Sequence, residues 1–60
     1  MIEFFVSHRH RPFPVGYFQA PSFYEAILLA SVEWGVEPKK LTAVLGSSHR
    51  ALQKLQYETN

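Results

Sequence analysis

The chain has 60 residues, of which 47% are hydrophobic and 18% charged, and its formal net charge is +1 at pH 7. These values are typical of a globular protein and argue against a disordered, fibrous or two-domain chain, so we expect one small domain over residues 1–60. A domain of this size buries only about 60% of the surface that its unfolded chain exposes. Because the chain has no cysteine, disulfides cannot support this small core, and association into a homodimer is the expected source of further stability.

No apolar stretch is long enough to span a bilayer, and the first residues lack the basic segment and long apolar run of a secretory signal. We therefore expect a cytoplasmic protein that has no membrane partner. The charges are unevenly distributed, since four Glu oppose two Arg through residue 37, whereas four Lys or Arg oppose one Glu after it. The C-terminal third of the chain is thus basic.

Residues 1–20 predict a β segment with a Pro-rich loop. The alternating side chains of residues 1–8 and their aromatic and β-branched content favour a strand. Residues 9–16 contain Pro12, Pro14 and Gly16, which favour a loop or an edge segment. Residues 17–20 are the candidate second arm of a hairpin. This arm is short, so either helices or another chain would cover the hairpin, or the strand would keep an unpaired edge.

A helix is predicted from Phe23 to about Trp34. Ser22 and Glu25 have the spacing of a capping box, in which each side chain binds a free backbone amide at a helix start. Gly35 can adopt the left-handed conformation that ends helices. Apolar side chains cover most of the circumference of this helix, so we expect it to lie centrally or at an interface.

Residues 38–57 predict two further helices. The first begins near Pro38 and ends at Gly46, with an apolar stripe of Leu41, Val44 and Leu45. The second begins at Ser47 or Ser48, and its apolar side is formed by Ala51, Leu52 and Leu55. The predicted fold class is therefore α+β, with an N-terminal β-strand or short hairpin over residues 1–20 followed by three helices over residues 22–57, the last two forming a corner.

This pattern of helix, glycine turn and basic helix resembles the generic helix-turn-helix motif, without indicating one family. Thr42 and Ser47 depart from the motif, which usually has a small Ala and an apolar residue at these positions. The resemblance implies a regulator that binds double-stranded DNA. It assigns DNA contacts to Lys39, Lys40, Ser48, His49, Arg50, Gln53 and Lys54.

In this arrangement the start of the last helix would enter the major groove. Arg50 would bind guanine and Gln53 adenine, whereas the lysines would contact phosphates. The basic loop around residues 8–11 would supply an auxiliary phosphate contact through Arg9 and Arg11.

The alternative function is protein interaction, as a small adaptor, inhibitor or assembly factor of the kind that phage genomes encode. Here Phe4 or Phe5 on an exposed strand edge would pair with the sheet of a partner. Aromatic side chains near the loop would fill pockets on that partner, namely Phe13, Tyr17 and Phe18.

The sequence predicts no catalytic, cofactor or metal site. His8, His10 and His49 have no Cys or Asp that could complete a metal site. Ser47, Ser48 and His49 are neighbours in sequence, which does not give the geometry of a nucleophile and its base. We therefore expect a non-enzymatic binding module.

Overall fold

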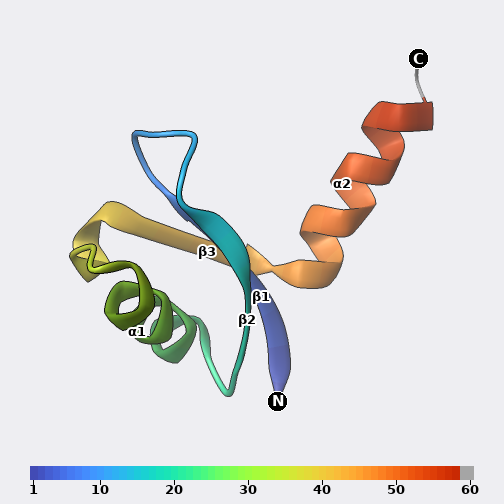
Figure 1. Cartoon of the computed structure of the whole chain (residues 1–60). Coiled ribbons are helices and arrows are strands. Elements are labelled where there is room, and N and C mark those ends of the chain that lie inside the picture. The colour runs from blue at the N-terminus through green and yellow to red at the C-terminus, as the bar shows by residue number, and fades with distance from the viewer. Residues whose placement is uncertain (59–60) are drawn as a thin grey trace.

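The computed structural model describes the backbone of residues 1–58 and the side chains of residues 1–55. It consists of a three-stranded antiparallel sheet, a helix packed on one face of that sheet, and a second helix that extends away from the sheet (Figure 1). In chain order the elements are β1 (Ile2–His8), β2 (Val15–Ala20), α1 (Phe23–Trp34), the 3-10 turn η1 (Pro38–Lys40), β3 (Leu41–Leu45) and α2 (Gly46–Glu58). The α+β class is confirmed, but the predicted set of elements is wrong.

β1 is the central strand and is paired along both of its edges. β2 pairs with one edge and β3 with the other, both antiparallel, which gives the sheet order β2-β1-β3. Phe4 lies opposite Phe18 on β2 and opposite Leu45 on β3. The expectation of an unpaired edge on the N-terminal strand is therefore wrong. Phe4, one of the two residues expected on an edge open to a partner, is only 1% exposed.

Alternation along β1 separates its side chains between the two faces of the sheet. Phe4 and Val6 are buried under α1, and the Phe4 ring lies 4.7 Å from the ring of Phe23. Glu3 and Phe5 therefore lie on the opposite face. We call that opposite face the open face; its members by alternation and register are Glu3, Phe5, Ser7, Val15, Tyr17, Gln19, Thr42 and Val44.

The core lies between α1 and the sheet and is small. Its fully buried members are Phe4, Val6, Ala20, Ala26, Ala30 and Leu41. Ala26 and Ala30 are one turn apart on α1, and their small side chains allow the helix to approach the strands closely. Trp34 closes one end of this layer with its ring edge-on to Phe18, at a centroid distance of 5.2 Å.

The predicted boundaries of α1 are confirmed. Ser22 caps the helix by accepting a hydrogen bond from the Glu25 amide at 3.3 Å. Gly35 ends it in the left-handed conformation, with φ of 65°, and donates its amide to the Ser31 carbonyl. The outer side of α1 is nevertheless more apolar than expected for solvent, since Tyr24 is 67% and Val32 86% exposed.

The two predicted helices over residues 38–57 are not both present, so there is no helix-turn-helix corner. Pro38 does begin a helical turn, but η1 ends after Lys40 and the chain continues as the strand β3. Gly46, expected to end a helix, instead begins α2. Only one of the two helices that the motif requires is therefore formed.

The prediction failed because a short apolar run fits two periodicities. Leu41, Val44 and Leu45 have helical spacing, yet a run of five residues is equally compatible with a buried strand. Pairing decides between them, since the backbone of β3 satisfies the second edge of β1 from Phe4 to His8. A helix at residues 41–45 would leave those polar groups of β1 unpaired.

Gly46 lies at a close approach of the chain to β1. A Cβ atom at this position would lie 2.9 Å from Cγ and 3.1 Å from the carbonyl oxygen of Glu3. Glycine therefore allows the chain to leave β3 and enter α2 directly beside β1. The residue that marked a helix end in the sequence instead marks a strand-to-helix corner.

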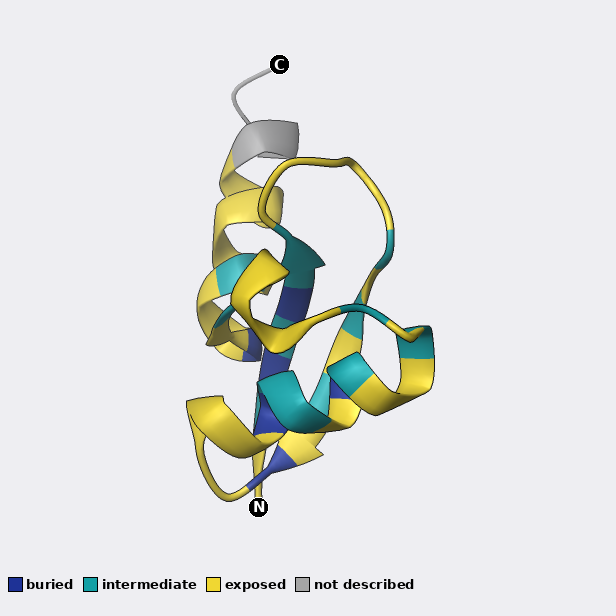
Figure 2. Cartoon of the chain, turned by 90° about the vertical axis from the view of Figure 1, so that its left-hand side faces the viewer, coloured by how far each residue is buried: buried dark blue, intermediate teal, exposed yellow. Residues whose placement is uncertain are grey.

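α2 extends away from the rest of the chain and is exposed along most of its described length (Figures 1 and 2). The Cα atoms span 36 × 27 × 14 Å, so the molecule is a thin layer rather than a sphere. Within residues 1–58, neither helix combines the length and the apolar character that crossing a bilayer requires.

Replacing Leu41 by Ala should cost about 2–5 kcal/mol of unfolding free energy, because Leu41 is fully buried and truncation leaves a cavity. This loss is comparable with the whole stability of a domain of this size. Leu45→Ala in the same strand is the matched control and should cost less than half as much, since Leu45 is 39% exposed. Urea denaturation followed by circular dichroism measures both. Equal losses would contradict the burial described for β3.

Candidate functional site

The residues predicted to contact DNA fall into two separate groups in the structure. Arg9 and Arg11 lie in the loop between β1 and β2, close to η1, which carries Lys39 and Lys40. The other predicted residues lie on α2, namely Ser48, His49, Arg50, Gln53 and Lys54. Each group belongs to a different surface of the molecule.

The first surface is the open face, where α2 begins. The imidazole of His49 stacks on the ring of Phe5, with 3.6 Å between centroids and 5° between planes. Nδ1 of His49 lies 2.8 Å from the hydroxyl of Tyr17 on β2. His49 therefore holds the start of α2 against β1 and β2 instead of pointing outward as a helix-turn-helix would require.

Arg50 continues this attachment. Its Nε and one terminal nitrogen donate to the two carboxylate oxygens of Glu3 at 3.1 and 3.2 Å, and its guanidinium lies 4.3 Å from the centroid of the Tyr17 ring. The hydrogen bonds to Glu3, and then the charge of Glu3, raise the pKa of Arg50 above its ordinary value. The residue expected to bind guanine thus binds an acid of its own chain.

Beyond these two residues, the apolar side of α2 has little cover from its own chain. Leu52 is 60% and Leu55 57% exposed. The open face is also partly uncovered, because Val15 on β2 and Val44 on β3, the two strands that flank β1, are exposed. The same chain therefore exposes an apolar stripe on α2 and apolar side chains on the open face.

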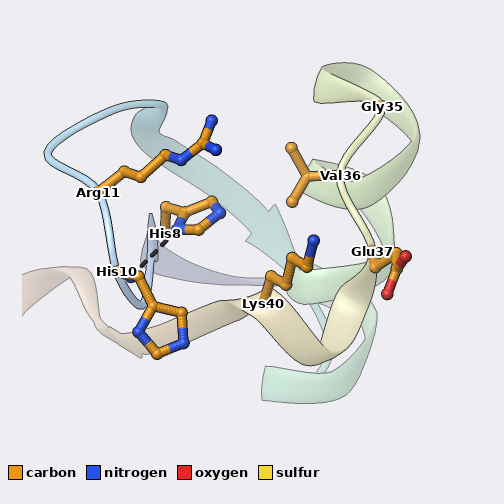
Figure 3. Close-up of a pocket in the computed structure, with 7 residues that line it drawn as sticks. All are labelled: His8, His10, Arg11, Gly35, Val36, Glu37 and Lys40. Carbon is orange, nitrogen blue, oxygen red and sulfur yellow. Dashed lines mark hydrogen bonds between the residues drawn. The ribbon is translucent and has the colours of Figure 1, made fainter.

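The second surface is a basic cleft on the α1 side of the sheet, with a volume of about 410 Å³ (Figure 3). The basic cleft is lined by His8, His10, Arg11, Gly35, Val36, Glu37 and Lys40. A hydrogen bond of 2.9 Å from the Arg9 amide to the Lys40 carbonyl joins the loop to η1. Basic residues that lie about thirty positions apart in sequence thus meet around one cavity.

The environment of His8 in this cleft disfavours its charged form. Burial, and then the charges of Arg11, His10 and Lys40, lower the pKa of His8 below its ordinary value of 6.5. Nδ1 of His8 accepts a hydrogen bond from the His10 amide at 3.1 Å. A neutral His8 therefore carries its proton on Nε2, which leaves that nitrogen as a hydrogen-bond donor.

A third surface lies on α1 beside the end of β2. It is a mostly apolar groove of about 560 Å³, lined by Met1, Gln19, Pro21, Glu25, Leu28, Leu29, Val32 and Glu33. We call it the α1 groove. The outer apolar side chains of α1 line this groove and are not part of the core.

Metal coordination was considered for the histidines of the chain. Within the described residues, no group of three or more His, Cys, Asp or Glu side chains comes together in a way that would hold a metal ion. His8 and His10 lie at the basic cleft, whereas His49 lies on the open face. The absence of catalytic activity stays a prediction.

Glu3→Gln should loosen the attachment of α2, because it removes the charge that binds Arg50. We expect the amides of the first turns of α2 to exchange hydrogen several-fold faster, with the α1 amides unchanged. Glu33→Gln, on the exposed side of α1, is the control with the same charge change. Exchange followed by NMR measures both variants. Unchanged protection of α2 in Glu3→Gln would contradict an anchoring role for this pair.

The His8 titration should lower stability in acid. The folded-state pKa of His8 lies below 6.5, so the unfolded chain takes up the proton first as pH falls through 6.5, and this favours unfolding. NMR of the imidazole should give a pKa below 6.5 that rises in Arg11→Gln. A His8 pKa at or above 6.5, or no response to Arg11→Gln, would refute the described electrostatics.

Contacts with DNA through the predicted residues stay a prediction, now without the motif that suggested them. Comparison with known proteins adds no assignment: no protein-family model, curated protein or solved structure matches this chain. Any function must therefore be argued from the surfaces themselves.

Proposed function

We propose that the chain is a non-enzymatic protein-interaction module that associates with a second copy of itself. In the proposed homodimer, the apolar stripe of α2 from each copy packs on the open face of the other. The observation that carries this proposal is the simultaneous exposure of Leu52 and Leu55 on α2 and of Val15 and Val44 on the sheet. The cytoplasmic location predicted from the sequence belongs to the same proposal.

The dimensions of the chain indicate that more of its surface is exposed than in a compact monomer. Its radius of gyration is 11.9 Å, whereas a compact chain of this length would have about 10 Å. Its accessible surface is 4487 Å², compared with about 4,000 Å² for a compact monomer of the same mass. This excess area is more than half of the area that each partner buries in a standard interface, about 800 Å².

The length of α2 supports the same conclusion. α2 has 13 residues, and isolated helices shorter than about 12–15 residues are marginal in water. Its attachment to its own chain through His49 and Arg50 lies near its start. Leu52 and Leu55 are three positions apart and so lie on one side of the helix, where a second apolar layer would stabilise it.

A second copy is the partner that fits both surfaces. A helix of 13 residues is about 20 Å long, and a strand of seven residues about 23 Å, so α2 matches the length of β1. In the described part of each chain no complete helix layer covers the open face, and no sheet packs against the apolar stripe of α2. In a two-fold symmetric dimer each α2 packs on the open face of the other copy, so the same contact is made twice.

Binding of DNA through a helix-turn-helix is not retained, because residues 41–45 form a strand and Arg50 binds Glu3. Protein interaction, which was the alternative function predicted from the sequence, is the function proposed here, but through a different surface. The docking surface is the open face with α2, and not the edge of β1.

The proposed dimer is tested by sedimentation equilibrium of the purified chain. We expect the mass of a dimer for the wild type and of a monomer for the double variant Leu52→Glu, Leu55→Glu, because carboxylates on this stripe would be buried without partners. Val32→Glu is the matched control. It introduces one carboxylate into the α1 groove, away from the proposed interface, and the variant should stay dimeric.

Cross-linking keeps the test valid if the double variant does not fold. Since the chain has no cysteine, the single variants Leu55→Cys and Val44→Cys can be mixed and oxidised. A mixed disulfide between them is necessarily intermolecular, and mass spectrometry identifies it. Leu55→Cys mixed with Val32→Cys is the control and should give none. The proposal would be overturned by a monomeric wild type. It would also be overturned if Val32→Glu were monomeric while the double variant stayed dimeric.

A further inference from the structure

We propose that the basic cleft binds the phosphate group of a small phosphate monoester. The site would be formed by Arg11 from the loop between β1 and β2, Lys40 from η1 and His8 from the end of β1. It lies on the α1 side of the sheet, whereas the proposed dimer uses the open face. The two proposals can therefore fail separately.

The charges around the cleft are unbalanced. Arg11 and Lys40 carry positive charge, whereas Glu37 is the one acid in the lining. Glu37 is also partly neutralised from outside the cleft, because its carboxylate lies 3.4 Å from Nζ of Lys39. An anion is the ligand that would relieve the mutual repulsion of these cations.

The donors suit a phosphate group. The guanidinium of Arg11 can donate two parallel hydrogen bonds to phosphate oxygens, and the ammonium of Lys40 supplies a point charge. Neutral His8 adds an Nε2 donor, since its Nδ1 is occupied by the His10 amide. Figure 3 shows Arg11 and Lys40 extending from opposite walls, with His8 between them.

The C-terminus of α1 also borders the cleft, and its partial negative charge would oppose an anion. Hydrogen bonds already occupy some of the carbonyl groups at this helix end. The Ser31 carbonyl accepts hydrogen bonds from the amides of Gly35 and Val36, and the Val36 carbonyl accepts one from the Ser31 hydroxyl at 2.6 Å. The side-chain cations therefore dominate the field in the cleft.

Size and lining define the rest of the ligand. A volume of about 410 Å³ is within the range of small-molecule sites and leaves room beyond a single phosphate. Val36 supplies the one apolar side chain of the lining, so the remainder of the ligand should be small and polar, such as a sugar. A nucleic-acid backbone fits less well, because Arg50 lies on the other face and binds Glu3.

The test is an NMR titration of the isotope-labelled chain at constant ionic strength, with inorganic phosphate, ribose 5-phosphate and ribose as separate probes. We expect saturable shifts of His8, Arg11 and Lys40 with both phosphates, tighter binding of ribose 5-phosphate, and no response to ribose. Since the bound anion favours the imidazolium form, the pKa of His8 should rise on saturation.

Variants identify the residues that bind. Lys40→Gln and Arg11→Gln should each weaken ribose 5-phosphate binding by about tenfold or more, the loss expected for one charge-assisted contact. Lys54→Gln is the matched control, because it removes the same charge from α2, which does not line the cleft. It should change the affinity by less than about twofold.

Three results would overturn the inference. Shifts that grow linearly without saturation would indicate general ionic effects, and equal losses in Lys54→Gln and Lys40→Gln would indicate net charge alone. A DNA duplex that shifts the same resonances at lower concentration than ribose 5-phosphate would assign the cleft to a nucleic-acid backbone.

Discussion

The pairing of β1 along both edges is the constraint on which the other features of the structure depend. β2 and β3 fix the register of this strand from both sides, so a one-residue shift would expose Phe4 and Val6. The same register places Glu3 and Phe5 on the open face and His8 at the edge of the basic cleft. One strand of seven residues thus supplies two of the buried core residues, the anchor of α2 and part of the candidate anion site.

The two sides of the sheet differ in how they are covered. α1 contributes small side chains, Ala26 and Ala30, to a close apolar contact on one side. On the other side the contact is aromatic and polar, because His49 stacks on Phe5 and Arg50 binds Glu3. Such a contact positions the start of α2 without burying its apolar stripe. The fold therefore has one complete layer and one incomplete layer, and interaction with a second chain would complete the latter.

The helix-turn-helix resemblance failed at a point where local sequence cannot decide. Pro38, Gly46 and the leucines between them fit the ends and stripe of a short helix, and the same residues fit a turn, a strand and a corner. The choice is made by β1, whose second edge needs hydrogen-bond partners. Gly46 illustrates this, since its lack of a side chain serves the approach to Glu3 and not a helix end.

The sequence by itself determined the local elements: the N-terminal strand, the Pro-rich loop and α1 with both of its caps at Ser22 and Gly35. These features depend on alternation and on hydrogen bonds between near neighbours, which a single segment encodes. Only the tertiary structure decided that residues 41–45 pair with β1, that Arg50 meets Glu3 47 positions away, and that Lys40 joins the loop at Arg9. Such contacts follow from which strand edges and apolar faces are left unsatisfied once the whole chain has packed, and no local segment carries that information.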